Sequence, residues 1–228
     1  MALTCVMCVY EEEDLLPGAL RSLEASGVDR VAVYDGAWEG FGEGPSGDRT
    51  VAIAREWGAD PVFEVDAPWR SQEEKRTTMF RTCGAVEGDH VFVFDADERL
   101  EGTFPALRPG QHYNVAVKCV GPNDMPGIRG EWPRGDYAPY YKPEIRIFAW
   151  HPDLHCLWPG GYWIGEQRIE PYKNAQGDPL LPVAANVSFL HLGNRRDPER
   201  IARKIAYYRE EHPKRQTRVN EAWRRRPW

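Results

Sequence analysis

The sequence lacks any long, uninterrupted apolar stretch. No run within its 228 residues approaches the roughly 20 apolar residues that a membrane-spanning helix requires. The N-terminus also lacks the basic flank and the long apolar block of a secretory signal peptide. We therefore expect no integral membrane segment and a cytoplasmic location.

Cysteine is also scarce. The chain has five cysteines, an odd number without regular spacing, which does not indicate a disulfide framework. Cys5 and Cys8 form a Cys-x-x-Cys pair within an apolar run, but positions i and i+3 of a strand point to opposite faces. We expect reduced cysteines that serve packing.

Charge is unevenly distributed. The hydrophobic fraction of 42% with 28% charged residues is that of a globular protein with a buried core. The net charge is −6, yet residues 195–228 hold 12 Lys and Arg against 5 Asp and Glu, which leaves −13 for the rest. This basic segment is either a solvated tail or a surface that binds phosphates, a membrane or a polyanion.

The first hundred residues alternate strand and helix signals at short intervals, which predicts a parallel sheet with crossover helices. Pro17 suits a first helical turn and Gly27 a helix end, while Ser71 with Glu74 forms a capping box. The expected strands are residues 3–9, 31–34, 62–65 and 91–94, with helices at residues 15–27, 48–58 and 71–86.

After Gly102 the pattern changes. Pro, Gly, Trp and Tyr crowd residues 121–165, which indicates loop-rich, ligand-facing material with only short strands such as residues 145–148. A last strand, residues 185–190, precedes a helix that begins at Asp197 and turns Ile201, Ile205 and Tyr208 to one face. We divide the chain into a strand-and-helix half (1–100), a loop-rich half of the same domain (101–194) and a basic C-terminal helix and tail (195–228).

Acidic residues follow three of the predicted strands. Ligands of open α/β sheets bind outside the carboxyl ends of the strands, where this chain places Glu11, Glu12, Asp35, Asp95 and Asp97. Two like charges about 4 Å apart repel by roughly 1 kcal/mol in water and 4 kcal/mol at a protein surface. Such clustering favours a bound divalent cation.

The order of these motifs resembles that of the glycosyltransferases of the GT-A fold, especially their large inverting family 2. That family has a Tyr-Asn-Glu-Glu-like turn after the first strand, Asp-Asp-Gly after the second and an Asp-x-Asp motif after the fourth. Here the corresponding residues are Val9-Tyr10-Glu11-Glu12, Tyr34-Asp35-Gly36 and Asp95-Ala96-Asp97. The match covers residues 3–100, and beyond them it rests on Arg146-Ile147-Phe148 and on Leu190-His191-Leu192-Gly193. It implies an α/β, Rossmann-like GT-A sheet that is mostly parallel and flanked by helices.

The resemblance also implies a metal site. Asp97, at the catalytic centre, would bind a cation that bridges the donor diphosphate, Asp95 would reach the ribose or a metal-bound water, and His191 would be a late metal ligand. Carboxylates suit Mn²⁺ or Mg²⁺, with phosphate oxygens completing the coordination shell. The simpler interpretations are an acidic turn for the two aspartates and a packing histidine for His191.

The resemblance makes residues 1–100 the half that binds the nucleotide-sugar donor, with a UDP-sugar favoured, and residues 101–194 the acceptor-side and catalytic half. In the family the position of Asp35 reads the nucleoside, and an arginine near Lys75 and Arg76 approaches the donor. The family's Ser-Thr-Asp after the glycine is replaced here by Ala37-Trp38-Glu39. An Asp-Gly turn and a charged helix face are the alternatives for Asp35 and Arg76. The expected donor-binding residues are Val9, Tyr10, Glu12, Asp35, Arg76, Asp95, Arg195 and Arg196.

The catalytic base is the least determined role. An inverting transfer needs a carboxylate within hydrogen-bond reach of the acceptor hydroxyl. Glu144, Asp153, Glu166 and Glu170 lie in the expected part of the chain, and we choose Glu166 because it adjoins the aromatic segment 158–163. Aromatic rings of that segment could stack on a sugar or a base, or belong to the core.

The predicted function is therefore metal-dependent glycosyl transfer from a nucleoside-diphosphate sugar to an acceptor hydroxyl. The acceptor is open among modified DNA or another polyanion, a protein, a small molecule and a peripheral lipid. Two alternatives remain: a haloacid-dehalogenase-like phosphatase, whose first aspartate of Asp-x-Asp is the nucleophile, and a sugar-nucleotide-binding module without turnover.

Overall fold

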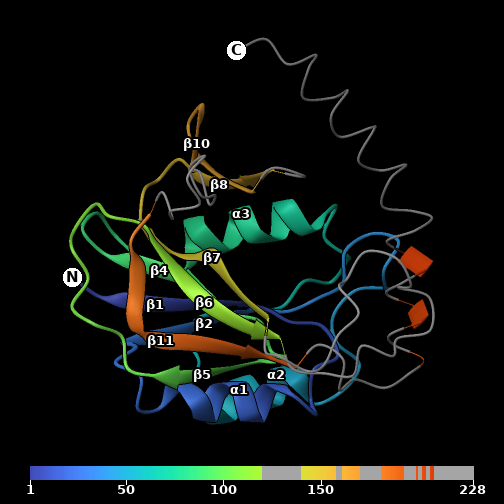
Figure 1. Ribbon diagram of the computed structural model, residues 1–228. Helices are drawn as coiled ribbons and strands as arrows, with labels where there is room; N and C mark the ends of the chain where they lie inside the picture. The colour runs from blue at the N-terminus through green and yellow to red at the C-terminus, as the bar shows by residue number, and fades with distance from the viewer. Residues whose placement is uncertain are drawn as a thin grey trace.

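The computed structural model describes residues 1–119, 140–157, 161–169 and 181–192, together with residues 199, 202, 203, 206 and 207. Figure 1 shows how its elements are arranged. Their bounds are β1 (Leu3–Cys8), α1 (Leu16–Leu23), β2 (Arg30–Tyr34), α2 (Thr50–Trp57), β3 (Val62–Phe63), α3 (Gln72–Thr82), β4 (His90–Val93), β5 (Glu98–Gly102), β6 (Tyr113–Cys119), β7 (Tyr140–Ala149), β8 (Leu154–Leu157), β9 (Gly161–Ile164), β10 (Gln167–Ile169) and β11 (Val183–His191).

Eight strands form the main sheet, in the order β3-β2-β1-β4-β7-β6-β11-β5. The four N-terminal strands β3, β2, β1 and β4 are parallel to one another. Beyond β4 the sheet is mixed, because β7 is antiparallel to both β4 and β6, whereas β11 is parallel to β6 and antiparallel to β5. The predicted α/β fold with a mostly parallel sheet is confirmed, and strands from residues 1–100 and 101–194 share one sheet.

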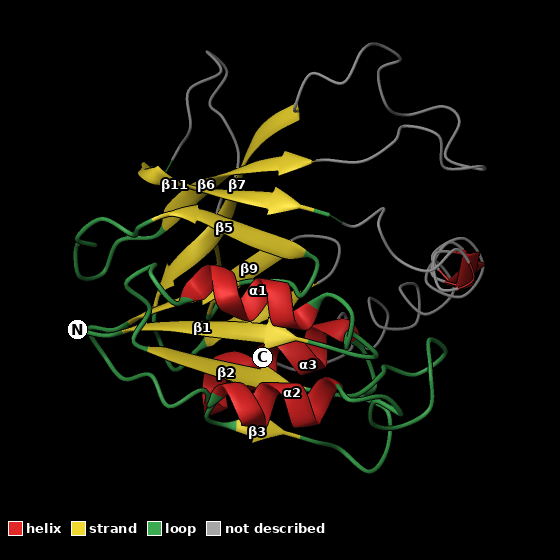
Figure 2. Ribbon diagram, turned by 90° about the horizontal axis from the view of Figure 1, so that it is seen from below, coloured by secondary structure: helices red, strands yellow, loops and turns green. Residues whose placement is uncertain are grey.

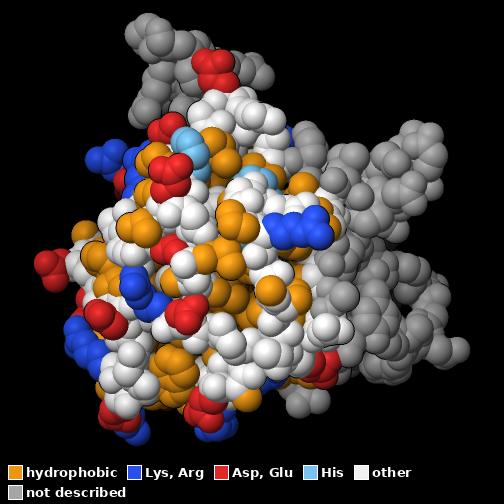
Figure 3. Space-filling model, turned by 90° about the vertical axis from the view of Figure 1, so that its left-hand side faces the viewer, with side chains coloured by type: hydrophobic (Ala, Val, Ile, Leu, Met, Phe, Trp, Pro, Cys, Tyr) orange, Lys and Arg blue, Asp and Glu red, His pale blue; other side chains and the backbone are white. Residues whose placement is uncertain are grey.

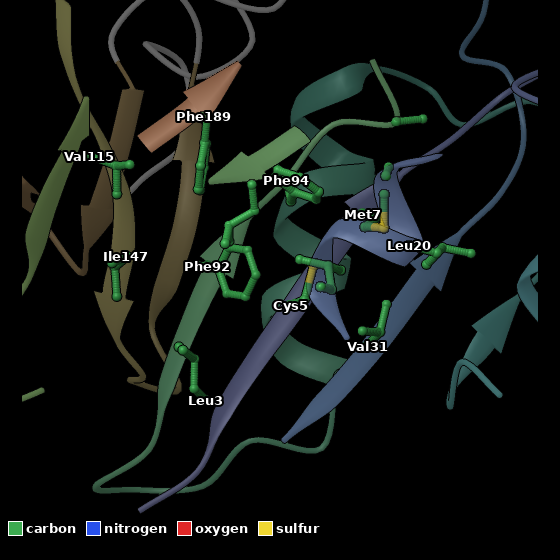
Figure 4. Packing of buried hydrophobic residues seen from close by; sticks show 14 of the residues in the cluster. Leu3, Cys5, Met7, Leu20, Val31, Phe92, Phe94, Val115, Ile147 and Phe189 are labelled. Atoms are coloured by element: carbon green, nitrogen blue, oxygen red, sulfur yellow. The ribbon is translucent and has the colours of Figure 1, made fainter. Parts of the chain in front are cut away.

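Helices cover both faces of the parallel part of the sheet. Figures 1 and 2 show α1 and α2 on one face and α3 on the other. The alternation of side chains along β1 explains this arrangement, because Leu3, Cys5 and Met7 pack into the cluster that contains α1, while Val6 packs into the cluster that contains α3. Figure 4 shows Cys5, Met7, Leu20 and Val31 gathered in the first cluster.

The cysteines for which the structure describes the side chain are free thiols: Cys5, Cys8, Cys83 and Cys156. Cys5 packs in the α1 cluster and the partly buried Cys8 against the α3 cluster. The Cys-x-x-Cys pair thus serves packing on two opposite faces of β1, as its spacing predicts.

Local signals set most helix ends. Gly27 and Gly58 take positive φ angles of 84° and 96° after α1 and α2, and the Ser71 hydroxyl accepts the Glu74 N–H at 3.1 Å at the start of α3. Three boundaries differ from the prediction. Helix α1 ends at Leu23 instead of residue 27, because the chain leaves the helix at Glu24 and only reaches Gly27 through a turn. Helix α3 ends at Thr82 instead of residue 86, because Gly84 turns the chain with φ 77°, and β3 pairs over only two residues instead of four.

A second sheet of three short antiparallel strands, in the order β10-β9-β8, packs on α3. The sequence predicted loop-rich material here, because strands of three or four residues carry little periodic signal. Tyr162 of β9 lies against Phe80 of α3 and Phe148 of β7, with ring centroids 5.7 and 4.4 Å apart. Aromatic contacts thus attach the small sheet to the main body.

In the part of the chain that the structure describes, no helix is long and apolar enough to cross a membrane.

The face at the left of Figure 1 carries interspersed acidic and basic side chains (Figure 3). The cluster of Asp and Glu residues predicted to be functional lies elsewhere, at the carboxyl ends of the parallel strands.

Candidate active site

Three parallel strands end side by side and bring the predicted donor-binding segments together. Backbone pairing continues just past the strands, since Val9 N donates to Tyr34 O, Asp35 N to Phe63 O and Phe94 N to Val6 O. The segments that begin at Tyr10, Asp35 and Asp95 therefore share one edge of the sheet, as the sequence predicted.

Asp97 and His191 meet at this edge although 94 positions separate them in the sequence. Strand β11 pairs with β5 so that His191 lies opposite Glu98, and Leu192 N donates to Asp97 O at 2.6 Å. His191 Nε2 lies 3.5 Å from Asp97 Oδ2, with the carboxylate buried and the imidazole partly exposed. A carboxylate and an imidazole thus face each other beyond the carboxyl end of β4.

Asp95 points toward two guanidinium groups. Its carboxylate oxygens lie 3.8 Å from Arg76 and 3.6 Å from Arg146, and about a quarter of its side chain remains exposed. Arg76 also donates to the Tyr162 hydroxyl at 3.2 Å. The predicted donor-binding pair Asp95 and Arg76 is therefore close, while Arg146 joins it from β7.

Arg146 is the centre of a buried ion network. It lies 2.8 Å from Glu98 and 2.9 Å from Glu144, and Glu98 is fully buried. Burial, together with the nearby charges of Asp95 and Asp97, raises the pKa of Glu98 above its ordinary value, and Arg146 opposes that rise. Burial by itself would lower the pKa of Arg146, but Glu98 and the other carboxylates outweigh it, so the guanidinium stays charged.

Asp35 and Lys75 are enclosed rather than open to a ligand. The Asp35 carboxylate is fully buried, with Ser46 Oγ at 2.5 Å from Oδ1 and Ser46 N at 2.8 Å from Oδ2. Lys75 is also buried, and its Nζ donates to Val9 O at 2.8 Å and Gly36 O at 2.6 Å. Burial lowers the pKa of Lys75, although nearby acidic groups oppose the shift. In this structure both residues hold the ends of β1 and β2 together.

Tyr10 packs beneath the loop of residues 37–45. Its ring lies 6.0 Å from that of Phe41, which stacks on Trp38 at 4.6 Å. Tyr207, from the C-terminal segment, contacts both Phe41 and Trp38. The donor-binding candidate Tyr10 therefore belongs to an aromatic cluster beside the site.

The C-terminal segment also makes a charged contact. Arg203 lies 3.4 Å from Glu11, so this basic residue faces the acidic turn after β1. The backbone of residues 199, 202, 203 and 206 is helical. Several residues named in the sequence predictions lie outside the described residues: Glu170, Arg195, Arg196, Ile201, Ile205 and Tyr208.

The base candidates lie at different ends of the structure. Glu144, on β7, reaches the network of Arg146 and Asp95. Glu166 is exposed in the turn between β9 and β10, next to the β7–β8 turn, where Asp153 O accepts the Gly165 N–H. Because Ala149, just before that turn, pairs with His90 at the start of β4, the structure does not bring Glu166 or Asp153 to Asp95.

The described residues contain no group of three or more His, Cys, Asp or Glu side chains that could hold a metal ion. The pair of Asp97 and His191 still fits one. Two neighbouring ligands of an octahedral cation with bonds of about 2.1 Å are roughly 3 Å apart, close to the observed 3.5 Å. Mg²⁺ commonly takes one or two carboxylates and completes its shell with waters and substrate phosphates.

Sequence reasoning missed two residues of this site. The sequence indicates Arg146 only as part of Arg146-Ile147-Phe148, because its ion pairs depend on the pairing of β7 with β4. Ser46 is not among the predicted site residues, because a single serine in a glycine-rich loop does not indicate its partners. The sequence feature that could identify it is the Ser-Gly-Asp-Arg-Thr segment at residues 46–50, which is rich in side chains that form hydrogen bonds.

No protein-family model matches the sequence, and a search of curated proteins finds no match either. Among solved structures, S. aureus TarS 1-349 in complex with UDP-GlcNAc matches with a TM-score of 0.50 and 12% identity, over 89% of this chain and 61% of that chain. The chain has a Rossmann-like GT-A fold.

Two further matches are more partial. S. aureus TarS itself matches over 56% of this chain and 23% of that chain, with 16% identity and a TM-score of 0.38. The mannosyltransferase PcManGT from Pyrobaculum calidifontis, in complex with GDP-Man and Mn2+, matches over 52% of this chain and 35% of that chain, with 23% identity and a TM-score of 0.36. This chain thus spans less than two thirds of each of these proteins.

Proposed function

We propose that this chain is a glycosyltransferase that moves a sugar from a nucleoside-diphosphate sugar to an acceptor hydroxyl with the help of a divalent cation. The observation that carries the proposal is the approach of His191 to Asp97 at the shared edge of β1, β2 and β4. Its GT-A fold matches that of TarS in complex with UDP-GlcNAc, which supports the same class of donor.

In this proposal Asp97 and His191 hold Mn²⁺ or Mg²⁺. Such a cation would neutralise charge on the leaving diphosphate and act as a Lewis acid. Arg76 and Arg146 lie beside Asp95, and their positive charges would offset the repulsion between its carboxylate and the anionic donor. Asp95 would bind the ribose or a water molecule.

Glu144 and Glu166 are the two candidates for the base that accepts the proton of the acceptor hydroxyl in an inverting transfer. Glu166 is the choice from the sequence, and Glu144 is favoured by its position next to Arg146. Replacing each by glutamine removes the base and keeps the shape. Loss of transfer with retained donor binding in only one variant would identify the base.

The proposal is tested by thermal unfolding with UDP, GDP and their sugars, in the presence and absence of Mn²⁺ or Mg²⁺. A ligand at one hundred times its Kd stabilises by about 2.7 kcal/mol, which shifts the Tm by about 5–10 °C in a chain of this size. We expect Asp97→Asn to abolish the metal-dependent part of the shift. Asp29→Asn is the matched control, because Asp29 accepts one backbone N–H at the opposite end of β1.

Three outcomes would contradict parts of this proposal. Full turnover in excess chelator would exclude the metal role. Donor binding without release of a nucleoside diphosphate, with every acceptor class supplied, would indicate a binding module. Hydrolysis of a generic phosphate ester without nucleotide binding would indicate the phosphatase.

A further inference from the structure

Three successive N–H groups in the turn after β1 donate to side chains of one later segment. Glu11 N donates to Ser46 Oγ at 2.7 Å, and Glu12 N to Thr50 Oγ1 at 2.7 Å. Glu13 N donates to Asp48 Oδ2 at 3.2 Å. We call residues 11–13 with residues 46–50 the clasp, and it fixes the backbone of the acidic turn.

The turn needs external support because one residue has an unfavourable backbone conformation. Glu11 has φ 51°, in the left-handed region that non-glycine residues rarely adopt. Such a conformation persists only where surrounding contacts determine it. The hydrogen bond from its own N–H to Ser46 is a contact of this kind.

Ser46 makes a second connection that Asp48 and Thr50 do not share. Its Oγ donates to Asp35 Oδ1 at 2.5 Å, and its N–H donates to Asp35 Oδ2 at 2.8 Å. Ser46 therefore joins the turn after β1 to the residue that follows β2. The loop between them is closed at its base, where Ala37 N donates to Gly44 O at 2.9 Å, so Ser46 is brought back to Asp35.

We infer that Ser46 is a positioning residue for the nucleotide donor. It acts through the turn of residues 10–13 and through Asp35, without touching the donor itself. The inference rests on the proposed function in one respect, because it takes a nucleoside diphosphate as the ligand of that turn. It also assigns the buried Asp35 carboxylate to holding Ser46 instead of reading the base.

The test compares three variants of the full chain. Ser46→Ala removes both hydroxyl bonds, and Ser46→Thr keeps the hydroxyl. Ser22→Ala is the matched control, because the Ser22 hydroxyl also makes two bonds, donating to Ala19 O at 2.6 Å and accepting from Leu100 N at 3.0 Å, and neither partner belongs to the clasp. Each variant is measured for amide hydrogen exchange and for UDP affinity with Mn²⁺ by calorimetry.

We expect faster exchange at residues 11–13 and about tenfold weaker UDP binding in Ser46→Ala, since a hydrogen bond to a charged group is lost. Ser46→Thr should restore both, and Ser22→Ala should change neither. Unchanged exchange of the turn in Ser46→Ala, or equal loss of affinity in Ser22→Ala, would overturn the inference alone. If the wild-type chain binds no nucleotide, the proposed function fails and the donor role of Ser46 fails with it.

Discussion

At the scale of single residues, the buried pair of Glu98 and Arg146 dominates the electrostatics of the site. Glu98 is fully buried and 2.8 Å from the guanidinium. Taking both charges out of water is costly, so the pair contributes little net stability, but removing one partner leaves an uncompensated buried charge. Arg146 is thus needed to keep the buried Glu98 paired next to Asp95.

Arg146→Met should therefore lower the free energy of unfolding by about 3–5 kcal/mol, measured by urea denaturation. The double variant Arg146→Met/Glu98→Gln should recover part of this loss, because the glutamine that replaces the buried Glu98 carries no charge. Equal destabilisation in the single and double variants would show that lost packing, and not charge, is responsible.

Gly42 determines how closely the loop of residues 37–45 approaches Tyr10. A Cβ atom at Gly42 would meet the Tyr10 hydroxyl oxygen at a distance shorter than real Cβ atoms show. Gly42→Ala should displace the Tyr10 ring and weaken nucleotide binding measured by calorimetry. Gly47→Ala is the control, because nothing lies within 4 Å of a Cβ there. Equal nucleotide affinities in both variants would show that Tyr10 does not contribute to donor binding.

At the scale of elements, the pairing of β11 with β5 assembles the candidate metal ligands. Its register places Val187 opposite Gly102 and His191 opposite Glu98. Gly102 has φ 94°, and a Cβ atom there would clash with the backbone oxygen of Asn186. This glycine therefore permits the close approach of two strands that brings His191 to Asp97.

Gly102→Ala should destabilise the chain and weaken metal-dependent nucleotide binding together, because the clash displaces β11. Gly88→Ala is the matched control: Gly88 has nearly the same φ, 92°, but nothing lies within 4 Å of its Cβ position. The backbone strain is common to both variants, so the difference between their Tm values measures the effect of the clash alone. If Gly102→Ala is no less stable than Gly88→Ala, β11 accommodates the methyl group.

At the scale of the whole molecule, two histidines at the end of the sheet opposite the site couple folding to pH. His90 starts β4 and is buried, and His112 Nδ1 accepts the Ala149 N–H at 3.1 Å. Burial, with His90 nearby, lowers the pKa of His112 from 6.5 to about 4, and burial lowers the pKa of His90. Folding therefore favours the neutral imidazoles.

Stability from His112 is fully present above pH 6.5 and should be lost as the pH falls toward about 4, because the unfolded chain binds the proton more readily. Urea denaturation between pH 7 and pH 4 measures this slope. His112→Asn should reduce the slope while offering an acceptor to Ala149. An unchanged slope would assign the acid sensitivity to other groups.

The sequence by itself determined the parallel half of the fold. Strands β1, β2 and β4, the capped start of α3 and the glycine end of α2 follow from local apolar patterns and backbone preferences. The gathering of Tyr10, Asp35 and Asp95 at one edge also follows, because parallel strands end on the same side.

The tertiary structure decided the contacts that depend on pairing between distant segments. Sequence patterns place His191 after a strand, but only the register of β11 against β5 brings it to Asp97. The ion pairs of Arg146 and the bond of Ser46 to Asp35 likewise require β7 and the loop after β2 to return to the site. A local pattern specifies which face a side chain takes, whereas long-range pairing specifies which side chain it meets.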